Sequence, residues 1–485
     1  MQKILRRAGS WAIRLVVTVV VVILLLPVLG ALNALRAVPE LQPWHELRSR
    51  LEPRAAEITP AFTLEAYLAR EDAVFREARA QVDDVVSKGA NTLVPNRYVE
   101  GSRSNPAQLA FAGNRSQVLQ SPQPRGGALL IHGLTDGPYS MRATAERLNA
   151  AGFYTLSLRM QGHGTVPGGL IDATWEDWMA AVRMGARHVR SQIGPGAPLV
   201  LVGYSNGGAL ITKYALEALD DATLPAPSKL ILMSPMIAVS PAARLASSIS
   251  RLGPVIHKAR WIDVVPEYNP FKYNSFPANA GAQTSLLTRA LNRQLLDAER
   301  AGKLPRMAPV LAFQSVVDTT VSAPAVVQDL FDHLPPGHGE LVVFDLNRLA
   351  GIDALTIPGA VLPKLIGDRP RPYSVTLVTN SSADTLDVSA MTVASGQQAI
   401  TTEPLGLSWP EDVYSLSHVA VPFPIDDPVY GGKGRGRDLG SVSLGRLSPR
   451  GEKSVLIVPA EVLMRLTWNP FFPYMAQRVE RWVTP

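Results

Sequence analysis

The segment that most limits what this chain can fold into is Gly203-Tyr204-Ser205-Asn206-Gly207, which directly follows an apolar run. The run, residues 199–202, consists of Leu and Val and is typical of a buried strand, whereas residues 209–214 are typical of a helix. A sharp strand-to-helix turn brings backbone segments into close contact, and glycine allows this because it has no Cβ. In this context Gly-x-Ser-x-Gly predicts a turn that exposes the Ser205 hydroxyl as a nucleophile.

Strand-like and helix-like runs alternate from residue 126 onward. Such alternation predicts an α/β fold with a mostly parallel central sheet and helices on both of its faces. Helix-like runs include residues 140–150 and 175–191. The strand-like runs are residues 128–132, 154–158, 199–204, 230–233, 310–314 and 341–344.

The N-terminus combines a basic start with a long apolar run; its basic residues are Lys3, Arg6, Arg7 and Arg14. A helix of about 19 residues from position 11 is about 28 Å long and can cross the hydrocarbon core of a bilayer. We therefore expect residues 1–35 to form a single-pass N-terminal transmembrane helix, an anchor or uncleaved signal. The basic flank predicts that the rest of the chain lies outside the cytoplasm, in the periplasm if the source is Gram-negative. A cleaved signal peptide is the alternative, because small residues follow the run.

Two further units are expected. Residues 36–110 read as a proline-containing linker and an amphipathic helix at 63–87. Residues 111–485 form the catalytic domain. Two stretches interrupt its alternation of strands and helices: residues 236–304, an aromatic-rich insertion that we expect to be a lid or cap, and residues 347–413, a β-rich insertion.

Composition excludes several classes of function. The 485 residues include no cysteine, so disulfides, thiolate metal sites and cysteine nucleophiles are impossible. A net charge of +6 with dispersed basic residues gives no support for nucleic-acid binding. Histidines and carboxylates show no metal-ligand spacing such as His-Glu-x-x-His, so neither a metal nor a cofactor is expected.

A serine nucleophile needs a general base, and that base needs a carboxylate. At a turn of this kind the acid follows the serine in the chain and the histidine follows the acid. Of the late histidines, His333 and His338 precede the strand at 341–344 and would lie at the wrong edge of a parallel sheet. His418 remains as the candidate base.

The acid candidate is Asp318, directly after the strand-like run 310–314. Asp384, which follows a second strand-like run, is the alternative, and a turn or helix-capping aspartate is the ordinary fate of either residue. Two backbone N–H groups must bind the oxyanion. We expect them from Asn206, next to the nucleophile, and from Leu134, in the glycine-containing loop after the strand 128–131. His132 in that loop is expected to be structural.

These motifs resemble the α/β-hydrolase superfamily, and within it the monoacylglycerol-lipase-like branch, the serine aminopeptidase S33 type. The segments that carry the resemblance are His132-Gly133-Leu134-Thr135, Gly162-His163-Gly164 and the Ser205 motif, together with Asp318 and His418. In that family the catalytic histidine usually follows the last strand within a short loop. Here Asn347-Arg348-Leu349 stands at that place, so the 347–413 insertion has to fold back to deliver His418.

The resemblance implies hydrolysis of a carboxylic ester through an acyl-enzyme. The expected substrate is a small acyl ester, and an apolar acid is favoured by the aromatic insertion and the anchor. Hydrolysis of an amide or peptide by the same residues is the first alternative. A non-catalytic, membrane-tethered interaction protein that keeps the fold is the second.

Overall fold

The computed structural model describes residues 39–88, 96–238, 256–318, 320–350, 370–411, 413, 415–432 and 465–484. The predicted membrane anchor at residues 1–35 lies outside them. Among the helices in these ranges, none is at once long enough and apolar enough to cross a bilayer.

A ten-stranded sheet forms the centre of the molecule, and seven adjacent strands of it are parallel. An antiparallel strand closes one edge and two antiparallel strands close the other. In spatial order the strands are β1 (Gln117–Leu119), β3 (Phe153–Leu158), β2 (Gly126–Ile131), β4 (Leu199–Tyr204), β5 (Lys229–Met233), β8 (Val310–Ser315), β9 (Gly339–Phe344), β10 (Ser374–Asn380), β11 (Asp387–Val393) and β12 (Ile400–Ser408). All six strands predicted from the sequence are present.

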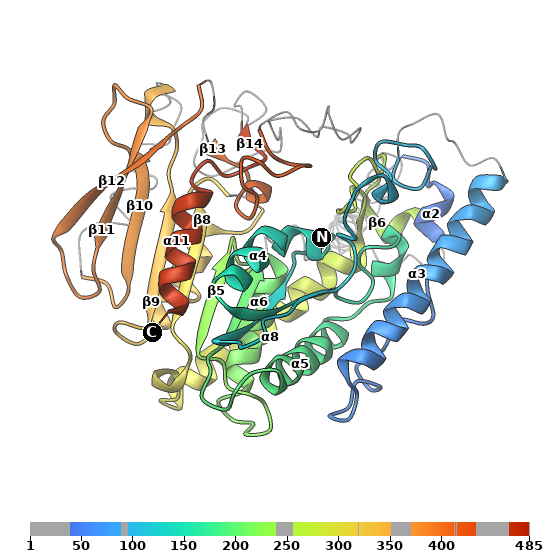
Figure 1. Ribbon diagram of the computed structural model, residues 1–485, viewed down its shortest axis with the longest axis horizontal. Coiled ribbons are helices and arrows are strands. Elements are labelled where there is room, and N and C mark those ends of the chain that lie inside the picture. Colours follow the sequence, from blue (N-terminus) through green and yellow to red (C-terminus); the bar gives the residue numbers. More distant parts are fainter. Residues whose placement is uncertain are drawn as a thin grey trace, which may run out of the picture.

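Helices cover both faces of the sheet, as the sequence predicts (Figure 1). Successive strand residues point to opposite faces, so Leu129 and Ile131 join one core while Ala128 and Leu130 join the other. The first core contains residues of α5 (Trp175–Ser191), α6 (Asn206–Glu217), α8 (Ala278–Arg300) and α9 (Ala323–Gln328). The second contains residues of α4 (Arg142–Ala150) and α11 (Phe472–Val483). Because β2, β4, β5 and β8 are covered on both sides, nearly all their residues are buried.

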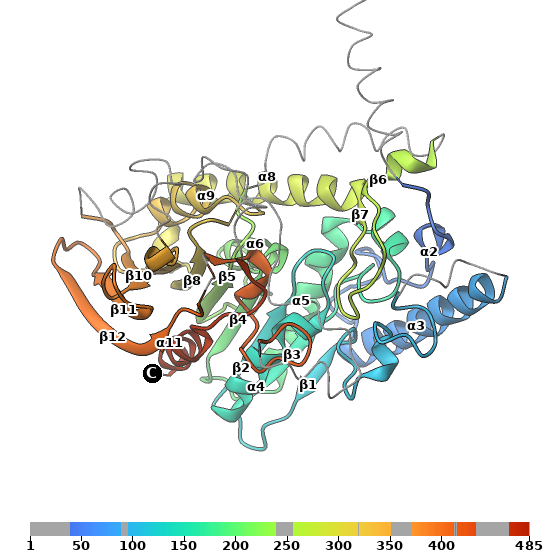
Figure 2. The same ribbon diagram turned by 90° about the horizontal axis from the view of Figure 1, so that it is seen from above.

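The predicted 347–413 insertion continues the main sheet. After β9 the chain returns as β10, parallel to β9, and then turns back twice as β11 and β12. These strands extend the sheet past α11 at the end of the molecule opposite α3 (Figures 1 and 2). The 236–304 insertion contains the short helix η4 (His257–Arg260), the strands β6 (Trp261–Asp263) and β7 (Phe276–Pro277), and α8.

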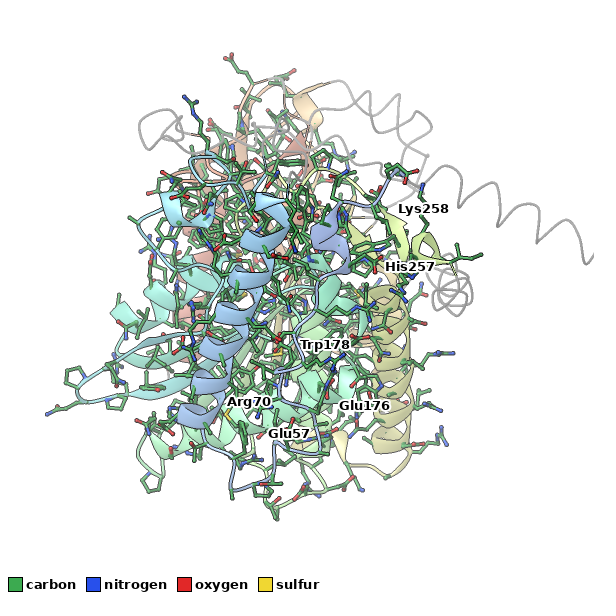
Figure 3. All side chains as sticks on the ribbon, turned by 90° about the vertical axis from the view of Figure 1, so that its right-hand side faces the viewer. Glu57, Arg70, Glu176, Trp178, His257 and Lys258 are labelled. Atoms are coloured by element: carbon green, nitrogen blue, oxygen red, sulfur yellow. The ribbon has the colours of Figure 1, made fainter. Side chains whose placement is uncertain are left out.

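Residues 39–88 pack on the domain. They contain α2 (Pro43–Glu46) and α3 (Leu64–Ser87), which begins where Thr63 Oγ1 accepts a hydrogen bond from Ala66 N. Leu64 and Tyr67 on α3 enter the first core. Figure 3 shows α3 across this end of the molecule, with Arg70 near Glu57, to which it is ion-paired at 3.1 Å.

Candidate active site

Ser205 lies on a strained turn between β4 and α6. Its backbone has φ 53° and ψ −116°, a conformation that non-glycine residues rarely adopt. Three backbone hydrogen bonds hold it there: Ser205 N donates to Met233 O, and Ser205 O accepts from Gly208 N and Met236 N. The side chain is only 4% exposed. Strain that the surrounding structure maintains in this way is a recurrent property of functional sites.

The flanking glycines allow β4, α6 and the end of β2 to meet. A Cβ on Gly207 would lie 2.1 Å from Ile131 O, and one on Gly203 would lie 2.5 Å from the carbonyl of Gly207. No other residue type can occupy these positions without moving backbone. The same contact brings the loop after β2 to the nucleophile, since a Cβ on Gly133 would be 3.2 Å from Ser205 Cβ.

The structure brings Asp318 and His418 together although 100 residues separate them. His418 Nδ1 lies 2.7 Å from Asp318 Oδ2, and both side chains are buried. Asp318 Oδ2 also accepts from Gln314 Nε2, while Oδ1 accepts from Thr320 N and Val321 N. The carboxylate is therefore fixed on both oxygens. By contrast Asp384, the alternative acid, is exposed between β10 and β11.

His418 is delivered by the chain that returns from the β10–β12 extension. Asn347, at the place where the family carries its histidine, instead donates its side-chain amide to Val413 O. The strand β13 (Ser415–Leu416) then pairs in parallel with β14 (Arg465–Leu466), and Ser315 Oγ at the end of β8 donates to Leu416 O. These contacts hold the backbone directly before His418.

The His418 ring stacks on the ring of Tyr204, the residue before the nucleophile. Their centroids are 5.3 Å apart with an interplanar angle of 29°, and Tyr204 OH donates to His418 O at 3.4 Å. The imidazole therefore lies over the end of β4. Ser205 and His418 both lie in the described ranges, and no hydrogen bond joins Ser205 Oγ to the imidazole; such a bond often tightens only with substrate bound.

The two predicted oxyanion donors lie at the turn. Asn206 is the first residue of α6, where an amide has no acceptor inside the helix. Gly133 O accepts from both His132 Nδ1 and Asp136 N. Because carbonyl and N–H point in opposite directions across a trans peptide, this orients the Leu134 N–H away from both donors.

His132 is structural, as expected. Its Nε2 accepts from Met160 N at 3.0 Å, so the hydrogen is on Nδ1 and is donated to Gly133 O. Burial lowers the pKa of His132 to about 4, so the ring stays neutral. In the same loop burial raises the pKa of Asp136 to about 6, with Lys272 and His418 acting in the opposite direction.

Within the described ranges, no group of three or more histidines and carboxylates could hold a metal ion. Two features of the site are not predicted by the sequence. Nothing in a single sequence indicates that Tyr204 stacks on His418. Nor does any local pattern in the sequence pair Glu52 with Arg159. These two residues form a buried ion pair below the loop that contains Gly133 and Leu134, which we call the oxyanion loop.

Comparison with known proteins agrees with this architecture. Residues 122–346 match the family model described as serine aminopeptidase, S33. A thermostable monoacylglycerol lipase of Bacillus sp. (strain H-257) is 36% identical over 91 residues, which are 19% of this chain and 35% of that relative. The chain thus spans about a third of that relative's length.

Two solved structures also resemble it. One, from a study of the metagenome-derived lipolytic enzymes LipS and LipT, is 21% identical with a TM-score of 0.38, over 48% of this chain and 89% of its own. The other, a monoacylglycerol lipase of Paleococcus ferrophilus, is 22% identical with a TM-score of 0.36, over 47% and 88%.

The close contact at Gly207 makes a first prediction. Gly207→Ala forces a methyl group against Ile131 O and should lower the free energy of unfolding by about 3 kcal/mol or more. Gly194→Ala is the matched control, since a Cβ there meets nothing within 4 Å. Urea unfolding of both variants measures the difference. Equal midpoints would show that the turn tolerates a Cβ.

The neutral, buried state of His132 makes a second prediction. Unfolded His132 binds a proton below pH 6.5 whereas the folded ring does so only near pH 4, so stability falls as pH decreases through this window. At 1.36 kcal/mol per pKa unit, His132 costs the folded state about 3 kcal/mol at pH 4. The stability advantage of wild type over His132→Gln should shrink by that amount from pH 7 to 4 in denaturant titrations. If the difference in stability between wild type and His132→Gln does not change with pH, the neutral, buried state of His132 is contradicted.

Proposed function

Because residues 122–346 match the serine aminopeptidase S33 model, we propose that they form an α/β-hydrolase domain and that the chain is a serine hydrolase of carboxylic esters. The observation that carries the proposal is the 2.7 Å contact between Asp318 and His418, with the imidazole stacked beside the strained Ser205 turn. The order serine, acid, histidine along the chain is that of the α/β-hydrolase arrangement.

In the proposed mechanism Ser205 Oγ attacks the acyl carbonyl while His418 Nε2 takes its proton. Asp318 Oδ2 holds the Nδ1–H and stabilises the imidazolium that forms. The N–H groups of Leu134 and Asn206 bind the tetrahedral oxyanion. The alcohol leaves with the proton from His418, and water then cleaves the acyl-enzyme by the same steps to release the acid and free Ser205.

We propose an ester of an apolar acid as the substrate. The similarity to a monoacylglycerol lipase supports this class. So do the contacts of the predicted lid: in residues 256–304, Tyr273 N donates to Thr135 O of the oxyanion loop, and Thr284 Oγ1 on α8 donates to Asn206 Oδ1 at 3.4 Å. This segment therefore contacts Asn206 and the residue after Leu134, and in the proposal it shapes the acyl pocket.

The nucleophile assignment gives a third prediction. A fluorophosphonate probe should label the wild type and leave Ser205→Ala unlabelled, because the probe reacts with an activated serine. His418→Ala should lower kcat on short-chain nitrophenyl esters by about 10³-fold or more. His333→Ala, which removes a histidine that instead contacts Glu299, is the matched control and should leave kcat unchanged.

The same assay separates the alternatives. Esters of increasing acyl length are compared with aminoacyl amides, and faster turnover of the amides would favour the peptide-hydrolase alternative. Folded wild-type protein that neither reacts with the probe nor hydrolyses either series would favour an interaction protein instead.

We also propose that residues 1–35 anchor the chain in a membrane, with the catalytic domain outside the cytoplasm. Support comes from the basic start and the apolar run in the sequence. Residues 39–46 bind the η4 end of the 256–304 segment, through Lys258 Nζ to Glu40 Oε1 at 2.7 Å and Arg260 Nη1 to Glu46 Oε2 at 3.1 Å. Membrane and catalytic domain would thus be joined beside the segment that borders the site.

A fourth prediction follows from the anchor. The full chain should sediment with membranes and resist extraction by high salt, since about 19 apolar residues span the bilayer core. Detergent should release it, and a variant lacking residues 1–35 should stay in the supernatant. Mass measurement of the mature protein decides between anchor and cleaved signal: an N-terminus beyond residue 30 would establish cleavage.

A further inference from the structure

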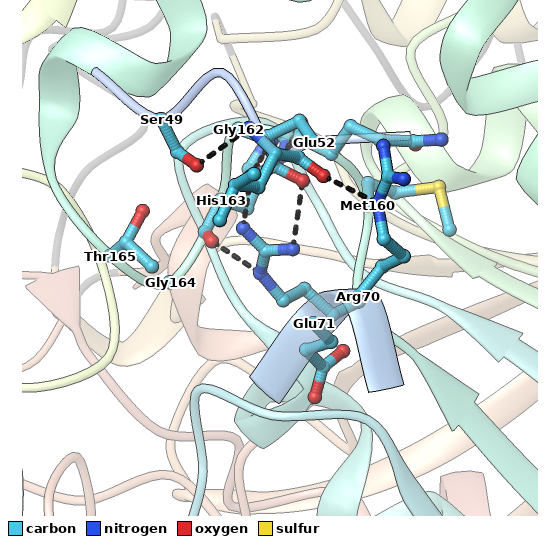
Figure 4. A network of polar contacts seen from close by, with 12 residues as sticks. Ser49, Glu52, Arg70, Glu71, Met160, Gly162, His163, Gly164 and Thr165 are labelled. Atoms are coloured by element: carbon cyan, nitrogen blue, oxygen red, sulfur yellow. Dashed lines mark hydrogen bonds and ion pairs between the residues drawn. The ribbon is translucent and has the colours of Figure 1, made fainter. Parts of the chain in front are cut away.

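The loop after β3, residues 159–163, is held from below by residues that precede the hydrolase domain. Glu52 and Arg159 form a buried, two-pronged ion pair: Arg159 Nη1 contacts Glu52 Oε2 at 3.2 Å, and Nη2 contacts Oε1. Figure 4 shows Glu52 beside Gly162 of this loop. Glu52 Oε1 also accepts from Gly162 N at 2.9 Å. The side chains of Glu52 and Arg159 are 7% and 1% exposed, so water can replace neither partner of the ion pair.

Further contacts from the same side fix the rest of this loop. Tyr67 OH on α3 donates to Arg159 O at 2.7 Å, and Gln161 Nε2 donates to Pro53 O. Arg159 Nε donates to His163 O at 2.6 Å. The position of the loop therefore depends on residues 52–67, which lie outside the segment that matches the family model.

The upper side of the loop holds the oxyanion machinery. Met160 N donates to His132 Nε2, and the His163 ring packs edge-on against the His132 ring with centroids 4.8 Å apart. His132 in turn holds Gly133 O and so sets the direction of the Leu134 N–H. A path of hydrogen bonds and short backbone links therefore runs from Glu52 through Arg159, Met160, His132 and Gly133 to the proposed oxyanion donor.

We propose that Glu52 is a positioning residue for catalysis: through Arg159 and the 159–163 loop it holds His132, and thereby the Leu134 amide, in the geometry that binds the oxyanion. The proposal rests on the function proposed above. It makes the segment between the anchor and the hydrolase domain a working part of the active site. A segment that only attached the domain to the membrane would have no influence on transition-state binding.

The test is the Glu52→Gln variant in the full chain, with turnover expressed per active site titrated by a fluorophosphonate. Because an oxyanion donor loses its alignment, kcat on a short-chain ester should fall about 10- to 100-fold while KM changes less than about twofold. The affinity for a trifluoromethyl ketone, which forms the tetrahedral adduct with serine, should fall by a similar factor.

Arg54→Gln is the matched control. Arg54 ties the same segment to the domain, but it contacts Asp177 Oδ2 and Asp172 O instead of the 159–163 loop. It should lower stability and leave kcat within about twofold of wild type. If Glu52→Gln and Arg54→Gln have the same kcat, the proposal is wrong.

A double-mutant cycle tests the path itself. Once His132→Gln has removed the link, Glu52→Gln should lower kcat by no more than about twofold. If Glu52→Gln lowers kcat by the same factor with and without His132→Gln, the proposal is overturned. If Glu52→Gln does not fold, the volume-matched pair Glu52→Leu with Arg159→Met, which leaves no buried charge unpaired, is measured with the same expectation. Full activity in Ser205→Ala would instead refute the serine mechanism, so the two failures are distinguishable.

Discussion

The contact on which the rest of this structure depends is a meeting of backbones at the end of β4. Gly207 lies against the Ile131 carbonyl, and Gly203 lies against Gly207, at distances that admit no Cβ. This packing forces Ser205 into its strained conformation and places the loop after β2 beside it. Nucleophile and oxyanion loop are thus positioned by one steric constraint within the rigid, buried part of the sheet. The packed strands around Ser205 maintain its strained conformation.

The other side of the site is assembled from distant parts of the chain. A parallel sheet gathers the carboxyl ends of its strands at one edge, which accounts for the positions of Ser205 and Asp318. No strand of the ten-stranded sheet carries His418 there. The chain first extends the sheet through β10–β12, and its return is held by Asn347, by Ser315 and by the β13–β14 pair. Lengthening the sheet thus separates His418 in sequence from Asp318, which it still contacts in space.

Residues before the segment that matches the family model also take part in this arrangement. The Glu52–Arg159 pair and Tyr67 support the loop whose amide binds His132, so the support of the oxyanion loop crosses the boundary of the family match. Residues 39–46 form ion pairs with the 256–304 segment, which borders the same oxyanion loop. Such contacts couple the segment that precedes the family match to the proposed active site through packing and hydrogen bonds, with no moving part required.

Local patterns in the sequence were enough to predict the strand–turn–helix at Ser205, six strands of the sheet, the amphipathic helix α3 and the candidates Asp318 and His418. The turn, the strands and the helix depend on residues that are neighbours in the chain. The two candidates depend on the order of elements that a parallel sheet imposes. The catalytic roles of these residues remain proposals. Only the tertiary structure decided that β10–β12 extend the sheet, that His418 stacks on Tyr204, and that Glu52 pairs with Arg159 across 107 residues. A buried charge must find a partner, but which partner is set by distances in space that one sequence does not record.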